Sequence, residues 1–378
     1  MLEFLAGIFV DLNRIIADAA HRQGFASVGF ARLRRLDERE ESYRRWLAEG
    51  RAGTMSYLAR EPERRFDPRV LDPAFRSVIS LTYPYAAPIA PRIDWRTELR
   101  GRIAAYALGR DYHDEVTRRA RNVADALTVA SPAAVARAYV DTGPVFEREW
   151  AAESRIGWIG RNTMLLNRER GSYFFLAEIF TSAELEPTAE PYGEFCGTCR
   201  RCMDLCPTGA LTDGYLMEPR VCISYLTIEH RGVIARELRP KLGEWIFGCD
   251  ICQEVCPWNG AAAAGDANPQ LMPSLPELLA LDDAAFSRRF TKSAIKRAKR
   301  RGLLRNVAIV LGNTKNPAAI APLSRALAEE PEALVRAHAA WALGNVAGAS
   351  ARSALEQARY RERDPDVARE IDEALESL

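Results

Sequence analysis

The 378-residue chain lacks any imbalance of charge, because its 52 lysines and arginines nearly cancel its 51 aspartates and glutamates and leave a formal charge of +1. Any surface for nucleic acid must therefore be local. The chain also lacks a long hydrophobic run and a twin-arginine leader. Its apolar start, residues 1–10, is too short to span a bilayer and has neither the basic residues nor the cleavage site of a signal peptide. We therefore expect a cytoplasmic protein without a membrane anchor.

Cysteine is absent from most of the chain, since all eight cysteines lie between residues 196 and 256. A secreted disulfide framework would be short and rich in cysteine throughout, so this distribution excludes one. In a reducing compartment such clustering indicates bound metal. The remaining composition, 48% apolar and 27% charged, excludes disorder, collagen-like repeats and coiled coil as global descriptions. The length allows roughly two to three domains.

The first half of the chain alternates between helical and strand-like patterns, which predicts an α/β or α+β domain. Helical spacing covers residues 11–23, 37–49 and 114–130, and apolar strand-like runs cover 77–83, 137–140 and 173–180. A stretch with proline and glycine at 183–194 predicts a linker, and residues 261–273 break all periodicity. We therefore divide the chain into domains of residues 1–183, 184–270 and 271–378.

From about residue 300 the sequence is helical and repetitive. Leu311-Gly312-Asn313 recurs as Leu343-Gly344-Asn345, and the same offset aligns Leu323 with Leu355 and Val335 with Val367. Recurrence of small and apolar residues on matching helix faces is typical of a short helical solenoid similar to HEAT repeats. A plain helical bundle with a chance match is the alternative.

Two cysteine runs indicate iron–sulfur clusters. The first, Cys196-Gly-Thr-Cys199-Arg-Arg-Cys202-Met-Asp-Leu-Cys206-Pro207, has the C-x2-C-x2-C-x3-C-P spacing, and the second, Cys249-Asp-Ile-Cys252-Gln-Glu-Val-Cys256-Pro257, lacks one cysteine that Cys222 can supply. In two-cluster ferredoxins the fourth cysteine of each run ligates the other cluster. One 4Fe–4S cluster then takes Cys196, Cys199, Cys202 and Cys256, and the other takes Cys206, Cys222, Cys249 and Cys252. The alternative, two structural zinc sites, usually uses separated cysteine pairs.

The chain as a whole resembles the epoxyqueuosine reductases, cobalamin-dependent enzymes of queuosine tRNA modification. The resemblance is most specific over residues 141–260. The motifs that carry it are Gly109-Arg-Asp-Tyr-His113, Val140-Asp-Thr-Gly-Pro144, Glu147-Arg-Glu-Trp150, Gly157-Trp-Ile-Gly-Arg-Asn-Thr163, Gly171-Ser-Tyr-Phe-Phe-Leu-Ala-Glu178, Cys222-Ile-Ser-Tyr-Leu-Thr-Ile-Glu229, Gly248-Cys-Asp-Ile-Cys-Gln253 and the Cys-Pro-Trp-Asn of residues 256–259.

The resemblance implies an α+β multidomain protein. Its expected parts are a nitroreductase-like domain that holds cobalamin, a ferredoxin-like domain with two 4Fe–4S clusters, and HEAT-like α-helical repeats that bind tRNA. The implied reaction is reduction of epoxyqueuosine to queuosine in the tRNA anticodon loop, with electrons from an external low-potential donor. We expect a monomer. A reductive dehalogenase and a non-catalytic electron carrier are the rival interpretations.

The candidate cobalamin contacts rest mainly on this resemblance. No D-x-H-x-x-G motif is present, and the chain has four histidines, so a histidine ligand to cobalt is not expected. The expected contacts are Arg65 for the cofactor phosphate, Asp141, Gly160, Asn162, Leu165 and Ser172, together with Ser224 between the two cysteine runs. Arg65 as a surface arginine, the glycines as simple turn residues and His113 as a structural histidine are the alternatives.

A basic run predicts the nucleic-acid surface. Residues 284–305 include no acidic residue but nine basic ones. Neutralising phosphates releases counterions, so such segregation favours RNA binding. The alternative is a helix face that docks onto acidic residues such as Glu329 and Glu330. The candidate tRNA contacts are Lys292, Lys296, Arg297, Lys299, Arg300 and Arg301.

Asp141 is the candidate general acid. Opening an epoxide creates an alkoxide, which needs a proton donor close to its oxygen. Asp141 follows an apolar strand-like run and precedes Thr142-Gly-Pro144, so it should project from the end of a strand, and the resemblance points to the same residue. The role requires a raised pKa, which burial could supply. The alternative is that Asp141 only accepts hydrogen bonds within its own turn, which would leave Tyr106 or Tyr112 as donors.

Overall fold

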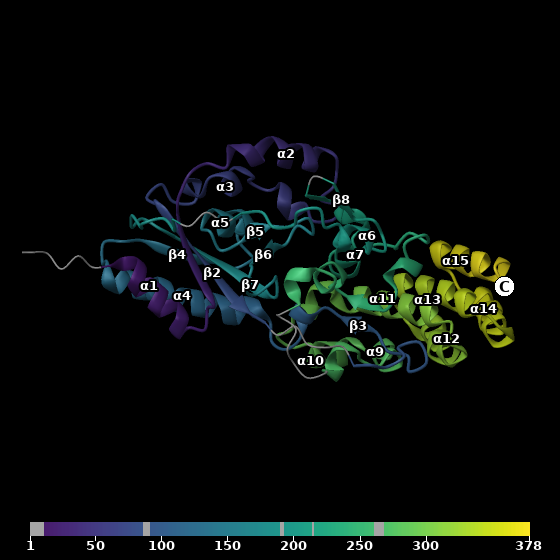
Figure 1. Cartoon of the computed structure of the whole chain (residues 1–378). Coiled ribbons are helices and arrows are strands. Elements are labelled where there is room, and N and C mark those ends of the chain that lie inside the picture. Colours follow the sequence, from purple (N-terminus) through teal and green to yellow (C-terminus); the bar gives the residue numbers. More distant parts are fainter. Residues whose placement is uncertain (1–10, 86–90, 190–192, 214, 261–267) are drawn as a thin grey trace, which may run out of the picture. The chain divides into compact units, whose positions relative to one another are not determined.

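The computed structural model describes residues 11–85, 91–189, 193–213, 215–260 and 268–378 (Figure 1). They form two compact units. The first comprises the described residues of Met1–Gly50, Ser56–Tyr85 and Tyr112–Cys199, and the second those of Arg51–Met55, Ala86–Asp111 and Arg200–Leu378. The domain limits at 183 and 270 stay predictions, since the units divide the chain elsewhere. The predicted break at 261–273 lies mostly outside the described residues.

A four-stranded antiparallel sheet, in the order β1-β2-β7-β4, forms the centre of the first unit. Its strands are β1 (Ser27–Arg32), β2 (Ser77–Pro84), β7 (Phe174–Thr181) and β4 (Ala136–Tyr139). The strands expected over 77–83, 137–140 and 173–180 are confirmed, and β1 is an addition to them. The register places Glu178 of β7 opposite Ser80 of β2 on one side and Tyr139 of β4 on the other.

Different helices cover the two faces of this sheet. Helices α1 (Leu12–Arg22) and α4 (Tyr112–Ala130) pack on one face, against Ile79 and Ile179. The other face packs on α5 (Glu147–Glu153), whose Trp150 lies 6.0 Å from Phe180 between ring centroids. Because side chains alternate along a strand, Glu178 shares the α5 face with Phe180.

The rest of the first unit consists of short elements. They are α2 (Asp37–Ala48), α3 (Glu63–Phe66) and a hairpin of β5 (Trp158–Ile159) and β6 (Leu165–Leu166). The helices expected over 11–23, 37–49 and 114–130 are therefore confirmed as α1, α2 and α4. Gly157 has to be glycine in the hairpin, because a Cβ there would lie 2.1 Å from the Leu166 carbonyl oxygen.

The second unit contains two short helices at matching positions of the two cysteine runs. Helices α6 (Arg201–Asp204) and α8 (Ile251–Glu254) are in contact, and each is followed by a Cys-Pro pair. Around them lie α7 (Ile223–Ile228), the hairpin of β8 (Leu211–Thr212) and β9 (Leu216–Met217), and the parallel pair of β3 (Arg102–Ile103) and β10 (Trp245–Phe247).

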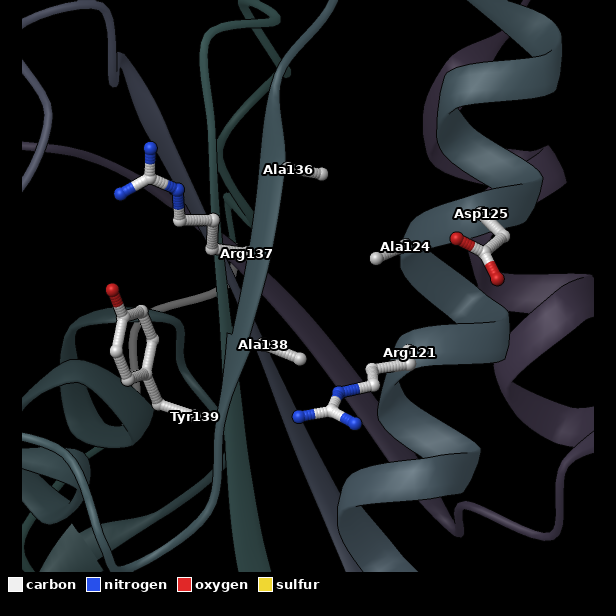
Figure 2. Close-up of a pocket in the computed structure, with 7 residues that line it drawn as sticks. All are labelled: Arg121, Ala124, Asp125, Ala136, Arg137, Ala138 and Tyr139. Atoms are coloured by element: carbon white, nitrogen blue, oxygen red, sulfur yellow. The ribbon is translucent and has the colours of Figure 1, made fainter.

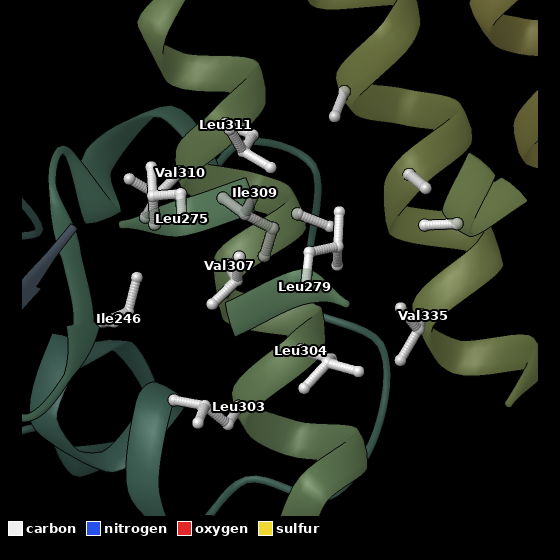
Figure 3. Packing of buried hydrophobic residues seen from close by; sticks show 14 of the residues in the cluster. Ile246, Leu275, Leu279, Leu303, Leu304, Val307, Ile309, Val310, Leu311 and Val335 are labelled. Atoms are coloured by element: carbon white, nitrogen blue, oxygen red, sulfur yellow. The ribbon is translucent and has the colours of Figure 1, made fainter. Parts of the chain in front are cut away.

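Stacked helices form the remainder of this unit. They are α9 (Leu275–Leu279), α10 (Asp283–Arg289), α11 (Lys299–Thr314), α12 (Ile320–Glu329), α13 (Ala333–Val346), α14 (Ala349–Arg361) and α15 (Pro365–Glu376). Helix α11 is buried on all sides from Gly302 to Gly312. It lies between β10, α9 and α13, where Val307 and Ile309 lie among Ile246, Leu279 and Val335 (Figure 3). The predicted repeat is confirmed: α11 packs on α13 and α13 packs on α15.

Candidate active site and cluster ligands

Asp141 occupies a strained turn at the end of β4. The turn is closed by a hydrogen bond from the Thr142 N–H to the Val140 carbonyl (2.5 Å), and Asp141 has a φ of +55°. This left-handed conformation costs about 1–2 kcal/mol for an ordinary residue and is tolerated best by Asn and Asp. The Asp141 side chain is 59% exposed. It therefore projects from the strand end as expected.

Two side chains from the start of α4 hold the Asp141 carboxylate. The Tyr112 hydroxyl donates to Oδ2 at 2.6 Å, and His113 Nε2 lies 3.1 Å from the same oxygen. Tyr112 is fixed by stacking on Phe175 of β7, with ring centroids 4.1 Å apart and planes 6° apart. The contact of His113 with Asp141 is thus compatible with the alternative interpretation of His113 as a structural histidine.

These contacts lower the pKa of Asp141. Partial desolvation would raise it, but the hydrogen bonds from His113 and Tyr112 and the positive charges of His113 and Arg148 outweigh that effect and hold the pKa of Asp141 below its usual value. The raised pKa that a general acid requires is therefore not produced at Asp141 by the protein's own residues.

Two further carboxyl groups lie behind this turn. The Asp141 N–H donates to Glu147 Oε1 at 2.5 Å. Burial, and then the charge of Asp141, raises the pKa of Glu147 to about 8. Glu178 is fully buried and accepts a short hydrogen bond from the Ser80 hydroxyl, which also lies 3.0 Å from the Ser154 hydroxyl. Burial raises the pKa of Glu178 well above its usual value, so this carboxyl is neutral.

Three of the candidate cobalamin contacts lie on one hairpin, and a fourth lies just before the next strand. Gly160, Asn162 and Leu165 belong to the β5–β6 hairpin, and Ser172 lies just before β7. The side chains of Asn162, Leu165 and Ser172 are buried. A Cβ at Gly160 would lie 2.4 Å from Leu166 Cδ1, so any larger residue there would have to displace the Leu166 side chain within the hairpin.

Arg65 and Ser224 lie elsewhere. Arg65 in α3 is buried, which contradicts its alternative interpretation as a solvated surface arginine. Its Nε has no hydrogen-bond partner among the described residues, so it could serve an anionic group. Ser224 is a half-buried residue of α7 in the second unit, and its backbone N–H donates to the Cys222 sulfur.

A cavity of about 350 Å³ opens between α4 and β4. It is lined by Arg121, Ala124, Asp125, Ala136, Arg137, Ala138 and Tyr139. Ala136 and Ala138 point toward α4, whereas Arg137 and Tyr139 point away from it (Figure 2). None of the predicted site residues lines this cavity.

Six of the eight cysteines lie in the second unit, although no three metal-ligating side chains among the described residues are grouped closely enough to hold a metal ion. Burial raises the pKa values of Cys222, Cys249 and Cys252, and the charges of neighbouring thiols, including Cys206, raise them further. Thiols that disfavour one another's ionisation need a cationic partner, which iron supplies. The ligands predicted for one cluster are Cys206, Cys222, Cys249 and Cys252, but the charge of Cys202, predicted for the other cluster, also acts on Cys252, so this set stays a prediction.

Hydrogen bonds to sulfur support the same interpretation. Burial alone would raise the pKa of Cys206, but hydrogen bonds from Thr208 and from the backbone N–H groups of Ala210 and Leu211 lower it. Such bonds stabilise a thiolate and tune a bound cluster. The other predicted ligand set is divided between the units, with Cys196 and Cys199 in the first and Cys202 and Cys256 in the second. The assignment of both ligand sets stays a prediction.

The basic run separates into exposed and internally bound cations. Lys292, Lys296, Lys299 and Arg301 are exposed. Arg297 bonds to Glu229 at 2.7 Å, and Arg300, whose side chain is 11% exposed, bonds to both oxygens of Glu330. Arg300 therefore makes the contact that the alternative interpretation predicted, with an acidic residue of the helical stack.

The sequence did not indicate that Glu147 and Glu178 belong to the site, or that Arg305 is a buried structural residue. The one sequence signal for Glu147 is its place in Glu147-Arg-Glu-Trp150, a motif that carries the family resemblance. Arg305 belongs to the basic run, yet it is buried and donates to the carbonyls of Leu226, His230 and Gly232.

No helix in the described part of the chain is long and apolar enough to cross a membrane.

Three segments match known families. Residues 65–142 match the family described as epoxyqueuosine reductase QueG, DUF1730; residues 195–259 match the 4Fe-4S double cluster binding domain; and residues 290–376 match HEAT repeats. The chain thus carries a double-cluster domain, which decides against the zinc alternative, and its helical tail is of the HEAT type.

Whole-chain relatives agree. The epoxyqueuosine reductase of Xanthomonas campestris is 39% identical over 337 residues, covering 87% of this chain and 94% of the relative. A crystal structure of epoxyqueuosine reductase with an epoxyqueuosine-modified tRNA-Tyr stem loop superposes with a TM-score of 0.90 at 30% identity, covering 97% of this chain and 98% of that one. The Bacillus subtilis enzyme, described with its catalytic aspartate loop swung out of the active site, gives 0.88 at 29% identity, with 97% and 99% covered. The identity and near-complete coverage of these relatives show that this chain belongs to the epoxyqueuosine reductase family.

Proposed function

We propose that this protein reduces epoxyqueuosine in tRNA to queuosine and that Asp141 delivers a proton to the epoxide oxygen. The observation that carries the proposal is the Asp141 carboxylate, held on a strained turn by Tyr112 and His113, in a chain whose family is that of the epoxyqueuosine reductases. Strain of this kind is concentrated at functional sites. The oxidoreductase activity and the tRNA substrate agree with the relatives' names.

The cysteines are the proposed ligands of two 4Fe–4S clusters. Cys206, Cys222, Cys249 and Cys252 hold one cluster, and Cys196, Cys199, Cys202 and Cys256 hold the other. Bound clusters would supply low-potential electrons, which an external donor provides.

Cobalamin is the proposed second cofactor. The buried Arg65, with its unsatisfied Nε, fits the cofactor's phosphate, and Gly160, Asn162, Leu165, Ser172 and Ser224 are the other proposed contacts. The chemistry that a bound, reduced cobalamin would supply is reduction at the epoxide carbon.

The protein's own residues orient the Asp141 carboxylate and deliver the proton to the substrate oxygen. Phe175 fixes Tyr112 by stacking, and Tyr112 and His113 fix the Asp141 carboxylate. The turn presents that carboxylate to solvent, where a substrate oxygen can reach it. For the tRNA, the exposed cations Lys292, Lys296, Lys299 and Arg301 are the proposed phosphate contacts.

The test is anaerobic turnover of an epoxyqueuosine-containing stem loop by protein loaded with clusters and cobalamin. Asp141→Asn nearly preserves the shape of the side chain but has no acidic proton. We expect this variant to bind cobalamin and tRNA as the wild type does and to lose at least about 99% of turnover, because general acids typically contribute 10²-fold or more. Near-normal turnover would remove Asp141 as the proton donor. A chain that retains no corrinoid absorbance would support the electron carrier instead.

A further inference from the structure

Glu147 and the Asp141 turn are directly joined. Glu147 is the first residue of α5, and its Oε1 accepts the backbone N–H of Asp141 at 2.5 Å. The bond fixes the Glu147 carboxyl beside the strained residue. Behind it, Glu178 of the central strand β7 is fully buried against Ser80. Three carboxyl groups therefore converge on the α5 face of the sheet, and one of them is exposed.

The proposed reaction needs more protons than Asp141 can hold. Reduction of an epoxide to an alkene breaks two C–O bonds, forms one C=C π bond and consumes two electrons and two protons, so the oxygen leaves as water. A single carboxyl carries one proton. Asp141 must therefore be reloaded within one turnover if both protons reach the oxygen through it.

The electrostatics of the site leave the available proton on Glu147. The pKa of Glu147 is raised to about 8, by burial and then by the charge of Asp141, whereas that of Asp141 is lowered. The charged groups that face Glu147 are Asp141 from the turn, Arg148 from its own helix and His113 from α4, and Glu178 faces it from β7. At neutral pH Glu147 is mostly protonated and Asp141 is ionised.

We propose that Glu147 holds the proton that reloads Asp141, and that it acts as a positioning residue through Asp141 without touching the substrate. The proposal rests on the proposed function. The proton leaves the Glu147 carboxyl for the Asp141 carboxylate and passes from there to the epoxide oxygen. Glu147 is left ionised until solvent returns a proton. Glu178 is fully buried and keeps its proton throughout.

The experiment compares loaded full-length enzymes over pH 6 to 9.5 with an epoxyqueuosine stem loop. The variants are Glu147→Gln, which keeps an oxygen for the Asp141 N–H but has no acidic proton, and Glu147→Asp, which keeps an acid. The matched control is Glu153→Gln, because Glu153 ends the same helix, is partly exposed and pairs with Arg34.

We expect wild-type kcat to fall above a pH near 8, because the reloading proton is lost there. In Glu147→Gln, kcat at pH 7 should fall at least about tenfold, the alkaline limb should disappear, and KM should stay within twofold of wild type. Glu147→Asp should recover part of the rate together with an alkaline limb, and Glu153→Gln should behave as the wild type.

Two kinetic outcomes would overturn the proposal. One is wild-type kcat with an intact alkaline limb in Glu147→Gln. The other is a slow Glu147→Gln enzyme whose limb persists and whose rate Glu147→Asp does not recover, since Glu147 would then only hold the turn.

Infrared difference spectroscopy gives a readout without turnover. Between pH 7 and pH 9.5 the wild type should lose a protonated-carboxyl stretch that belongs to Glu147, whereas the stretch of Glu178 should stay. Persistence of the pH-dependent stretch in Glu147→Gln would also contradict the proposal. Failure of the proposed function is separate: a wild-type enzyme that does not reduce the stem loop, or a fully active Asp141→Asn, would refute that function even where the infrared assignment holds.

Discussion

Asp141 has a strained backbone, and its pKa is lowered, so that it is ionised although its proposed role is to donate a proton. Its positive φ places the carboxyl beyond the strand end, where Tyr112 and His113 reach it. The same two partners stabilise the carboxylate, so they orient the group and lower its pKa together. Orientation and acidity are thus divided between two residues: Asp141 presents the group, and Glu147 keeps the proton.

Cys222 is the residue on which the cluster assignment depends most, because it alone lies outside both cysteine runs. Burial raises the pKa of Cys222, backbone N–H groups of Tyr225 and Ser224 that donate to its sulfur lower it, and the charge of Cys206 raises it. We expect Cys222→Ala to lower the iron content from about eight to about four per chain, following the two-cluster count. Iron analysis and electron paramagnetic resonance after anaerobic reconstitution would measure this.

The matched control is Ser224→Ala, which leaves the backbone N–H to Cys222 in place and should keep both clusters. A Cys222→Ala protein with two intact clusters would show that the eighth ligand is another residue.

At the scale of helices, the recurring glycines explain the repeat. A Cβ at Gly312 of α11 would lie 2.8 Å from Ala342 of α13, and one at Gly344 of α13 would lie 2.9 Å from Ala374 of α15. Each glycine thus lets the next helix of the stack approach closely. The following asparagine ties the layers together, since Asn345 Nδ2 donates to the Gly312 carbonyl at 2.9 Å.

Gly312→Ala should therefore destabilise the stack although alanine is the better helix former. The new methyl group would overlap the Ala342 backbone, and overpacking of this kind costs about 1–3 kcal/mol. Gly302→Ala in the same helix is the control, because its nearest neighbour, Ala298 Cβ, would lie 3.8 Å away. That substitution should be neutral or stabilise by up to about 1 kcal/mol.

The denaturant midpoint of the helical circular dichroism signal would measure both variants. Equal midpoints for the two substitutions would contradict close packing at Gly312.

At the scale of the whole molecule, charge is balanced overall but segregated locally. The tertiary contacts remove Arg297, Arg300 and Arg305 from the free cations of the basic run, by bonds to Glu229, to Glu330 and to main-chain carbonyls. Six cations of the run remain exposed without such a bond to the rest of the described unit: Arg288, Arg289, Lys292, Lys296, Lys299 and Arg301. The surface that can meet a phosphate backbone is therefore smaller than the basic run suggests.

The double variant Lys296→Gln/Lys299→Gln should weaken tRNA binding and lower the slope of log K against log salt by about one unit for each phosphate that the protein no longer neutralises. Arg352→Gln/Arg361→Gln in α14 removes two exposed cations of the same unit as a control and should change the slope less. Binding of a labelled tRNA over a range of salt concentrations would measure both. Equal slopes in the wild type and the first variant would leave the basic run without a role in RNA binding.

The sequence by itself determined the features that depend on local spacing. Cysteines separated by two or three residues specify the ligand runs of the clusters. Apolar strand-like runs predicted β2, β4 and β7, helical patterns predicted α1, α2 and α4, and the recurrence of Leu-Gly-Asn predicted the stacked helices. The position of Asp141 at a strand end followed from its neighbours in the chain. Each of these depends on residues close together along the backbone, where geometry is set by the secondary structure alone.

Only the tertiary structure decided which charged groups are neutral, paired or free. The register of β7 with β2 and the packing of α5 bury Glu178 and bring its carboxyl to the side of the sheet where Glu147 lies. Arg300 is bound because the chain returns 30 residues later with Glu330. The free energy of a charge depends on its surroundings in three dimensions, so desolvation and pairing between residues distant in sequence cannot be deduced from the order of amino acids along the chain.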